Sequence, residues 1–223
     1  MRVLIVGVGR AGLSVAQYLS KSGHEVTVID RDGTVAERAS EQSGLVALTG
    51  DATDATVLED AEVTRADVVV AMLRRDADNL AVALLARAYG VKRVMVRMRD
   101  LAYRTVYLSA GVDRLLSETE VLLGALGTAI EHESVRHAML LGNGESVAVE
   151  IAVPLDSPIA GRSVSDIAMD PNFPASCVFA GLYGSDGSVE GPRGSSVVQG
   201  GSIVLLVTRR DELARTIDFL GAK

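Results

Sequence analysis

The chain has 223 residues, 48% of them hydrophobic, and its 29 acidic and 22 basic side chains give a net charge of −7. This hydrophobic fraction excludes a disordered chain, and an acidic balance without a long basic block argues against nucleic acid or anionic lipid as a direct partner. The longest apolar runs, such as 203–207, are far shorter than the roughly 20 residues of a membrane helix, and the single cysteine, Cys177, is typical of the reducing cytoplasm.

The first thirty residues combine a strand, a glycine turn, a helix and a second strand. An apolar run at 3–6 follows Met1-Arg2 directly, so we expect no cleaved leader. The turn at 7–12 has the spacing Gly-x-Gly-x-x-Gly, and a helical pattern at 13–19 leads to a strand at 26–30.

The turn at 7–12 has the chemistry of a phosphate site. Gly7 permits a tight exit from the strand, Gly9 lets the main chain approach a phosphate, and Gly12 lets the helix lie close to the sheet. The unpaired amides at the helix start favour an anion. Asp30, at the end of the second strand, can accept both ribose hydroxyls of an adenine nucleotide. The segment predicts an adenine-nucleotide site, and the alternative is a turn whose glycines serve close packing alone.

The alternation of strand and helix continues to residue 117. Helices are predicted at 34–42, 53–61, 76–89 and 101–109, and strands at 45–48, 67–72, 94–96 and 113–116. Strands with continuous apolar residues belong to a parallel sheet that is covered on both faces. We therefore expect an α/β fold, with a doubly wound Rossmann-type sheet in domain 1–117 and a ligand crevice at the carboxyl ends of its strands.

Residues 118–141 are predicted to form a connecting helix. Apolar residues recur at spacings of three and four between Val121 and Ile130. Gly124 and Gly127 weaken such a helix by roughly 1 kcal/mol each unless another helix packs there. We expect this segment to join subunits.

The hydrophobic period changes to two after residue 142. Strands are predicted at 147–153, 177–182 and 202–208, helices at 162–169 and 211–220, a turn at Ser185-Asp186-Gly187 and a glycine-rich loop at 191–194. This pattern predicts a second, smaller α+β domain over 142–223.

Several of these segments resemble the RCK family of potassium-transport regulators, also called the TrkA/KtrA family. They are Val6-Gly7-Val8-Gly9-Arg10-Ala11-Gly12, Val28-Ile29-Asp30, Gly50-Asp51-Ala52-Thr53-Asp54, Asp78-Asn79-Leu80 and Gly90-Val91-Lys92-Arg93-Val94, followed in the second domain by 149–154 and 158–164. The motif at 50–54 is the more specific one, because general dehydrogenases share the glycine turn but seldom that segment. The resemblance implies an RCK N-terminal (TrkA-N) domain followed by an RCK C-terminal (TrkA-C) domain.

The resemblance also implies a function. Such a protein is a cytoplasmic regulatory subunit, not an enzyme, that forms homodimers and then a higher ring, an octamer, beneath an integral membrane potassium channel or transporter. It binds ATP, ADP or NAD(H) and thereby controls K⁺ transport. The residues expected to bind the nucleotide are Gly7, Val8, Gly9, Arg10, Ala11, Gly12, Asp30, Arg31, Asp51, Ala52, Ala71, Met72 and Arg97.

Individual members of this set have separate roles. Asp30 should hold the ribose, and its charge beside Arg31 disfavours the 2′-phosphate of NADP. Arg10 lies in the glycine turn, where a guanidinium can bind a terminal phosphate in its own subunit or across a dimer. By resemblance, Asp51 and Ala52 lie near the adenine and its ribose, although a Gly-Asp turn explains Asp51 as well.

Two further positions near the same crevice have competing interpretations. Arg97 and Arg99 follow the fifth strand, and an ion pair with a neighbour such as Asp100 explains them equally well. By resemblance, Glu118 approaches the bound phosphates at the dimer contact. A carboxylate there is repelled unless a metal lies between, which implies Mg²⁺ or Ca²⁺ with ATP. The alternative is a helix N-cap region made of Ser117 with Glu118 and Glu120.

Other candidate sites are weaker. His132 and His137 are five residues apart and would lie on different faces of a helix, so a zinc site is not expected. Some relatives bind a cyclic dinucleotide between paired C-terminal modules, but no motif supports this here, and Arg162 and Arg193 are better explained as ordinary loop arginines.

Two enzyme classes are the alternatives to a binding function. An NAD-dependent oxidoreductase of the Rossmann class needs an acid or base near the nicotinamide, but after His137 the chain has no further histidine and only one lysine, Lys223. An ATPase needs the Gly-x-x-x-x-Gly-Lys-Ser/Thr loop, which the sequence lacks. Nucleotide binding without turnover is therefore the predicted chemistry.

Overall fold

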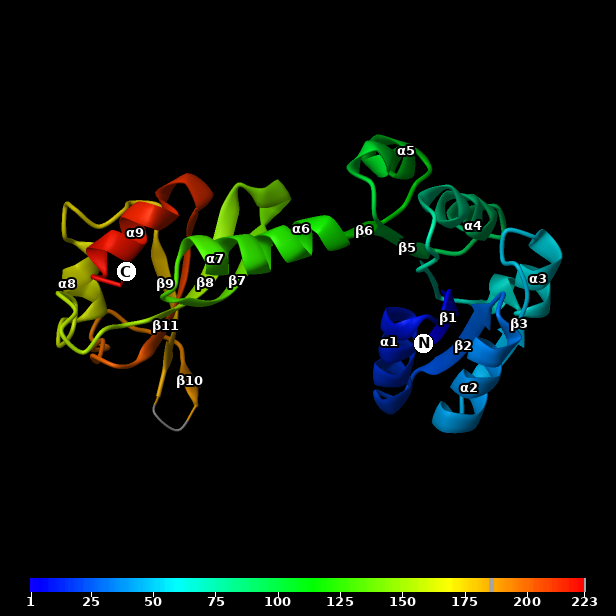
Figure 1. Cartoon of the computed structure of the whole chain (residues 1–223), viewed down its shortest axis with the longest axis horizontal. Coiled ribbons are helices and arrows are strands. Elements are labelled where there is room, and N and C mark those ends of the chain that lie inside the picture. The colour runs from blue at the N-terminus through cyan, green and yellow to red at the C-terminus, as the bar shows by residue number, and fades with distance from the viewer. Residues whose placement is uncertain (185–186, 223) are drawn as a thin grey trace. The chain divides into compact units, whose positions relative to one another are not determined.

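The computed structural model describes residues 1–184 and 187–222, and the chain forms two compact units, 1–118 and 119–223 (Figure 1). Each unit has its own sheet and its own hydrophobic core. None of the helices within the described ranges combines the length and the apolar character that a membrane span requires.

The first unit is built on a six-stranded parallel sheet with the order β3-β2-β1-β4-β5-β6. The strands are β1 (Arg2–Val6), β2 (Glu25–Asp30), β3 (Val46–Thr49), β4 (Val68–Ala71), β5 (Arg93–Met98) and β6 (Arg114–Ser117). In the central register, Ile5 of β1 is paired with Val28 on one side and with Val70 on the other. The strand order therefore reverses between β1 and β4. Doubly wound folds bind their ligands at this switch point.

Helices cover both faces of this sheet. They are α1 (Arg10–Lys21), α2 (Gly33–Ser43), α3 (Ala55–Asp60), α4 (Asp76–Ala88) and α5 (Arg104–Ser109), with single 3₁₀ turns at 63–65 and 101–103. Leu4 and Val6 of β1 pack in one core with residues of α3, α4 and α5, whereas Val3 and Ile5 pack in the other core with residues of α1 and α2. Successive residues of one strand are thus buried on opposite faces, which confirms the predicted doubly wound fold.

The second unit begins with a helical segment that is shorter than predicted. α6 (Glu118–Leu122) continues through a π-helical turn (Leu123–Gly127) into α7 (Thr128–Glu131), where the helical segment ends. Residues Val135–Leu141 form the strand β7 instead of the predicted end of the helix. A register shift between Val135 and His137 interrupts the alternation of buried and exposed residues in β7, so the sequence pattern does not show period two.

Gly124 allows the helical segment to lie close to β7. A Cβ added to Gly124 would come within 2.9 Å of Cγ of Leu140. The neighbour that this glycine accommodates is therefore a strand residue, not the second helix that the sequence suggested.

A five-stranded antiparallel sheet with the order β10-β9-β11-β8-β7 completes the second unit. Its other strands are β8 (Ser146–Ala152), β9 (Val178–Tyr183), β10 (Val189–Glu190) and β11 (Ile203–Arg209), and its helices are α8 (Val164–Ala168) and α9 (Leu213–Phe219). Alternate residues of β8, namely Val147, Val149 and Ile151, pack in a core with residues of α8 and α9. The smaller α+β domain is confirmed, whereas β10 was not predicted, and residues 185–186 of the predicted turn lie outside the described residues.

Candidate nucleotide-binding site

A cavity of about 540 Å³ lies at the carboxyl ends of β1 to β5 in the first unit. Of the thirteen predicted nucleotide-binding residues, the structure brings these to the cavity wall: Gly7, Gly9, Arg10, Ala11, Gly12, Asp30, Arg31, Asp51, Ala52, Met72 and Arg97. Val8 and Ala71 are buried and do not line the cavity. The predicted residues therefore come from separate loops that the parallel sheet gathers at one edge.

The glycine turn leaves the start of α1 bare. Gly7 has φ +91°, and a Cβ at Gly12 would lie 2.1 Å from the carbonyl oxygen of Gly7, so both positions require glycine. Gly9 is the N-cap of α1 and supplies no side-chain cap, and the first turn of α1 has no acidic residue. The first amides of a helix have no intrahelical partner. Here they lie beside the cavity, where they can bind an anion.

Gly9 differs from the other two glycines of the turn. A Cβ at Gly9 would have no atom within 4 Å, so the space beside this residue is open. The close packing of the turn explains Gly7 and Gly12 but not Gly9. An approaching phosphate would explain it.

The carboxylate of Asp30 is held in position by main-chain amides. Its Oδ2 accepts a hydrogen bond from the amide of Val8 at 2.8 Å, and its Oδ1 accepts one from the amide of Asp32 at 3.1 Å. An ionised carboxylate has about four lone-pair sites. The remaining sites can accept the two hydroxyls of a ribose, and the carboxylate cannot rotate away because the turn itself holds it.

Asp51 lies in the loop after β3 and forms a turn of its own. Its Oδ1 accepts hydrogen bonds from the amide of Thr53 at 3.0 Å and from the hydroxyl of Thr53 at 2.7 Å. These two hydrogen bonds keep the pKa of Asp51 below its ordinary value, and the bond from the amide has the larger effect. Asp51 therefore makes the local turn that the sequence offered as an alternative, and it also lines the cavity.

Arginine dominates the charged wall of the cavity. Six arginines line it, namely Arg10, Arg31, Arg74, Arg75, Arg97 and Arg99, against four aspartates, Asp30, Asp32, Asp51 and Asp78. Within the described parts of the chain, the guanidinium groups of Arg10, Arg31 and Arg74 make no hydrogen bond or ion pair. A wall on which arginines outnumber aspartates, with some arginines lacking a partner, suits a ligand that has several phosphate charges.

Arg74 and Arg75 were not among the predicted residues. They lie in the loop between β4 and α4, beside the point where the strand order reverses. Their position after a buried strand was the signal that could have found them, since parallel strands place the residues after their carboxyl ends at one edge of the sheet.

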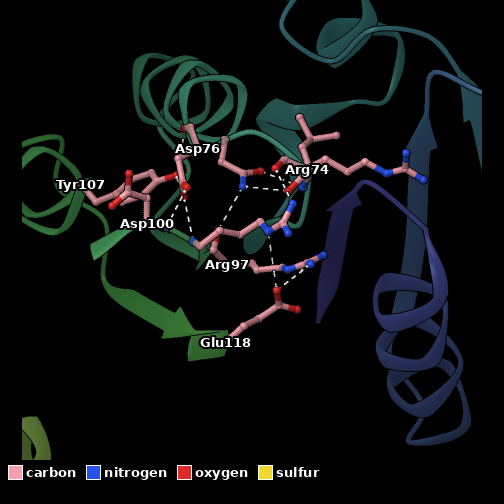
Figure 2. A network of polar contacts seen from close by, with 9 residues as sticks. Arg74, Asp76, Arg97, Asp100, Tyr107 and Glu118 are labelled. Atoms are coloured by element: carbon pink, nitrogen blue, oxygen red, sulfur yellow. Dashed lines mark hydrogen bonds and ion pairs between the residues drawn. The ribbon is translucent and has the colours of Figure 1, made fainter. Parts of the chain in front are cut away.

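Arg97 and Glu118 face each other in an ion pair (Figure 2). The Nη2 atom of Arg97 lies 2.7 Å from Oε2 of Glu118, and Nε of Arg99 lies 3.8 Å from the same oxygen. Asp100, considered as a partner from the sequence, instead accepts a hydrogen bond from the amide of Ala102. Glu118 does not line the cavity.

The surroundings of Glu118 do not form a metal site by themselves. Across 1–184 and 187–222, no group of three or more His, Cys, Asp or Glu side chains could hold a metal ion. The nearest charged groups to this carboxylate are guanidinium groups, which repel a cation. A metal at Glu118 stays a prediction, and the residues of one chain do not fit it.

Two buried polar side chains hold the loops that carry these arginines (Figure 2). Asn79 accepts a hydrogen bond from the amide of Leu73 at 2.8 Å and donates to the carbonyl oxygens of Leu73 and Arg97. The carboxylate of Asp76 accepts from the amides of Arg99 and Asp100 and from the hydroxyl of Tyr107. Burial and the bond to Asp76 raise the pKa of Tyr107 well above its ordinary value. The loops after β4 and β5 are thereby tied to α4.

A second cavity of about 580 Å³ lies at the opposite, amino-terminal end of the strands. Both of its arginines are in ion pairs with glutamates of the same cavity: Arg2 with Glu25 at 2.9 Å and Arg65 with Glu62 at 2.7 Å. This cavity has no glycine turn and no bare helix start. It offers much less to an anionic ligand than the cavity at the carboxyl ends.

The candidates in the second unit have structural partners. Nη2 of Arg162 lies 3.0 Å from Oδ2 of Asp170 and donates to the carbonyl oxygen of Asp166. Nδ1 of His137 lies 2.8 Å from Oε2 of Glu150. Because Arg162 already has these partners, its geometry does not point to a cyclic dinucleotide.

Comparison with known proteins gives matches over both units. The TrkA-N domain model matches residues 3–118, and the TrkA-C domain model matches residues 148–221. A Trk system potassium uptake protein TrkA homolog of Methanothermobacter thermautotrophicus is 26% identical over 95% of this chain and 95% of its own. A second TrkA homolog, of Archaeoglobus fulgidus, is 30% identical over 96% of this chain, which spans about half (48%) of that relative.

Solved structures share the fold. The GsuK channel bound to NAD superposes with a TM-score of 0.69 at 21% identity, over 99% of this chain and 39% of the channel chain. A GsuK structure bound to ADP matches 57% of this chain and 34% of its own, with a TM-score of 0.53 at 24% identity. The matched domain models cover the greater part of the sequence in the order seen in the structure. The chain therefore belongs to the family of TrkA proteins, in which a TrkA-N domain with the RCK fold precedes a TrkA-C domain.

Proposed function

We propose that this protein is a cytoplasmic regulatory subunit of a potassium channel or transporter, and that its first unit binds an adenine nucleotide, ATP, ADP or NAD(H), as a controlling ligand. The observation that carries the proposal is that one cavity is lined both by the start of α1, which has no side-chain cap, and by Asp30, whose carboxylate is held by main-chain amides. The first can bind phosphate and the second ribose.

The composition of the cavity wall supports binding without turnover. Within the described residues, the wall has no His, Lys, Cys, Ser, Thr or Tyr side chain. These types supply many nucleophiles and general acids or bases, and of the four aspartates on the wall, Asp30 and Asp51 already accept hydrogen bonds from main-chain amides. This composition favours binding over the oxidoreductase and ATPase alternatives. The ligand would then act by binding one state of the assembly better than another.

Assembly with other subunits is part of the proposal. The relatives that carry the name of a potassium uptake system support an integral membrane partner, and the helical segment supports homodimers and a higher ring. This segment has exposed apolar side chains at Val121, Leu122, Leu123, Leu126 and Ile130. Exposed apolar side chains concentrated in one short segment are typical of a contact surface.

Isothermal titration calorimetry with ATP, ADP, NAD and NADH tests the ligand, and analysis of the mixtures after incubation tests turnover. We expect saturable binding of at least one of these nucleotides and no product. Absence of heat with all four nucleotides contradicts the proposal, and steady product formation favours an enzyme. Co-purification of the tagged chain with a membrane potassium transporter from its native cells tests the partner.

A further inference from the structure

The carboxylate of Glu118 forms ion pairs with two arginines of the nucleotide cavity. Figure 2 shows Glu118 directed toward Arg97. Oε2 of Glu118 lies 2.7 Å from Nη2 of Arg97 and 3.8 Å from Nε of Arg99, and both arginines line the cavity. The side chain of Arg97 is 19% exposed and that of Glu118 is 36% exposed, so water screens this pair less than it screens a surface pair.

The guanidinium of Arg97 is incompletely paired by this contact. Its Nε is buried and has no hydrogen-bond partner among the described residues, and a single nitrogen of the group contacts Glu118. An arginine is always charged and binds best when two of its N–H groups meet two oxygens of one anion. A phosphate group offers more oxygens than the carboxylate in this geometry, so it can compete for Arg97.

Two anions cannot share these arginines without repulsion. A nucleotide with phosphates at the start of α1 would bring negative charge to the wall that Arg97 and Arg99 line. We propose that Glu118 is an affinity-determining residue of this site, an internal anion that neutralises Arg97 and Arg99 until nucleotide phosphates displace it. This inference rests on the proposed binding of a nucleotide in the same cavity.

Displacement of Glu118 would also affect the segment that connects the two units. Glu118 is the first residue of α6, the element at which the first compact unit ends and the second begins. Ligand and helix start would share one pair of arginines, so binding at the cavity changes the contacts of the connecting segment. By reciprocity, a change that pulls Glu118 from Arg97 strengthens nucleotide binding.

Calorimetry on the full chain tests the competition with adenosine, AMP, ADP and ATP in EDTA. Glu118→Gln removes the competing charge and keeps the size of the side chain. We expect ADP and ATP to bind this variant about fivefold tighter than the parent. A partly exposed ion pair that no longer has to be broken is worth about this factor in affinity. Adenosine, which has no phosphate, should bind both proteins equally.

Matched variants separate competition from a general loss of charge. Glu25→Gln also breaks an arginine pair, with Arg2 at 2.9 Å, but it lies at the opposite end of the sheet, and it should leave affinity unchanged. Arg97→Gln should weaken ADP and ATP binding. In the double variant Arg97→Gln/Glu118→Gln, most of the gain from Glu118→Gln should disappear, because the shared partner is gone.

The outcomes distinguish this inference from the proposed function. If the parent binds nucleotide but Glu118→Gln binds ADP and ATP no tighter, the competition is overturned while nucleotide binding stands. If Glu118→Gln binds ATP more weakly in Mg²⁺, Glu118 is a metal ligand and the competition is also overturned. Failure of parent and variant alike to bind any of the four compounds overturns both.

Discussion

Asp30 and Val8 are joined by a hydrogen bond from the Val8 amide to Oδ2 of Asp30, 2.8 Å long, which links the end of β2 to the glycine turn after β1. The same carboxylate thus shapes the phosphate side of the cavity and presents oxygens for a ribose. A substitution at Asp30 should therefore affect both ends of a nucleotide.

Asp30→Asn tests the ribose contact with little change in shape. The oxygen of the amide can still accept the hydrogen bond from Val8, but an NH2 group, which only donates, replaces the oxygen that accepts from Asp32, so the ribose loses a charged acceptor. We expect NAD and ATP to bind about tenfold to a hundredfold more weakly, because hydrogen bonds to a charged group contribute roughly 1.5–3 kcal/mol. Calorimetry measures the affinity, and circular dichroism should show an unchanged fold. Equal affinity of variant and parent would place the ribose elsewhere.

Gly9→Ala and Gly12→Ala form a matched pair in one turn. A methyl group added at Gly9 would meet no atom within 4 Å, so we expect unchanged stability but phosphate binding weakened on the order of tenfold, because the methyl group fills the space of the ligand. A methyl group added at Gly12 would lie 2.1 Å from the Gly7 carbonyl oxygen, which should lower the free energy of unfolding by about 1–3 kcal/mol. Thermal unfolding and calorimetry give the two readouts. Normal nucleotide binding by Gly9→Ala would show that no phosphate lies there.

The second unit should lose stability in acid through Glu150. Its carboxylate accepts a hydrogen bond from the hydroxyl of Tyr183, which is the main cause of a lowered pKa of Glu150, and His137 lowers it further. A carboxylate with a lowered pKa in the folded state stabilises the fold at pH values above its unfolded pKa. That contribution is lost as the pH falls through the folded pKa.

Tyr183→Phe removes the main cause of this shift. We expect the variant to be less stable than the parent at neutral pH and the difference to shrink as the pH falls through the lowered pKa of Glu150 and its carboxylate becomes protonated. Urea unfolding at several pH values measures this difference. Tyr18→Phe is the control, because Tyr18 is exposed and its hydroxyl has no hydrogen bond among the described residues. A difference that is constant with pH would contradict the role of the hydrogen bond.

Gly127→Ala and Gly124→Ala test why the connecting segment contains two glycines. A Cβ at Gly127 would meet nothing within 4 Å, so alanine should stabilise the helix by about 1 kcal/mol. A Cβ at Gly124 would lie 2.9 Å from Cγ of Leu140, so the same gain in propensity should be outweighed by overpacking, and Gly124→Ala should be destabilised. Thermal unfolding of the two variants should move in different directions. Equal stabilisation by both would show that Leu140 moves aside freely.

The first sheet was predictable because its strands are continuous runs of apolar residues in the sequence. Val3, Leu4, Ile5 and Val6 are all buried, and a run of this kind is compatible only with a sheet covered on both faces. The glycine turn, Asp30 and Asp51 were found because each lies at or just after the carboxyl end of an apolar segment of the sequence. Local sequence thus predicted which loops meet at the cavity.

The features that sequence did not predict depend on pairing between distant segments. β7 contains a register shift, and β10 has only two residues, so neither shows a clear period. The ion pair of Arg97 and Glu118 joins the ends of two neighbouring strands, β5 and β6, and only the register of the sheet brings them together. The roles of Asp76 and Asn79 also depend on loops that follow other strands.

The two outermost strands of the first sheet, β3 and β6, have four residues each. A neighbouring chain that tried to extend this sheet would find few free backbone groups to bond, and short borders of this kind protect β proteins from uncontrolled fibre growth. Pairing of copies through the two borders of this first sheet is therefore disfavoured.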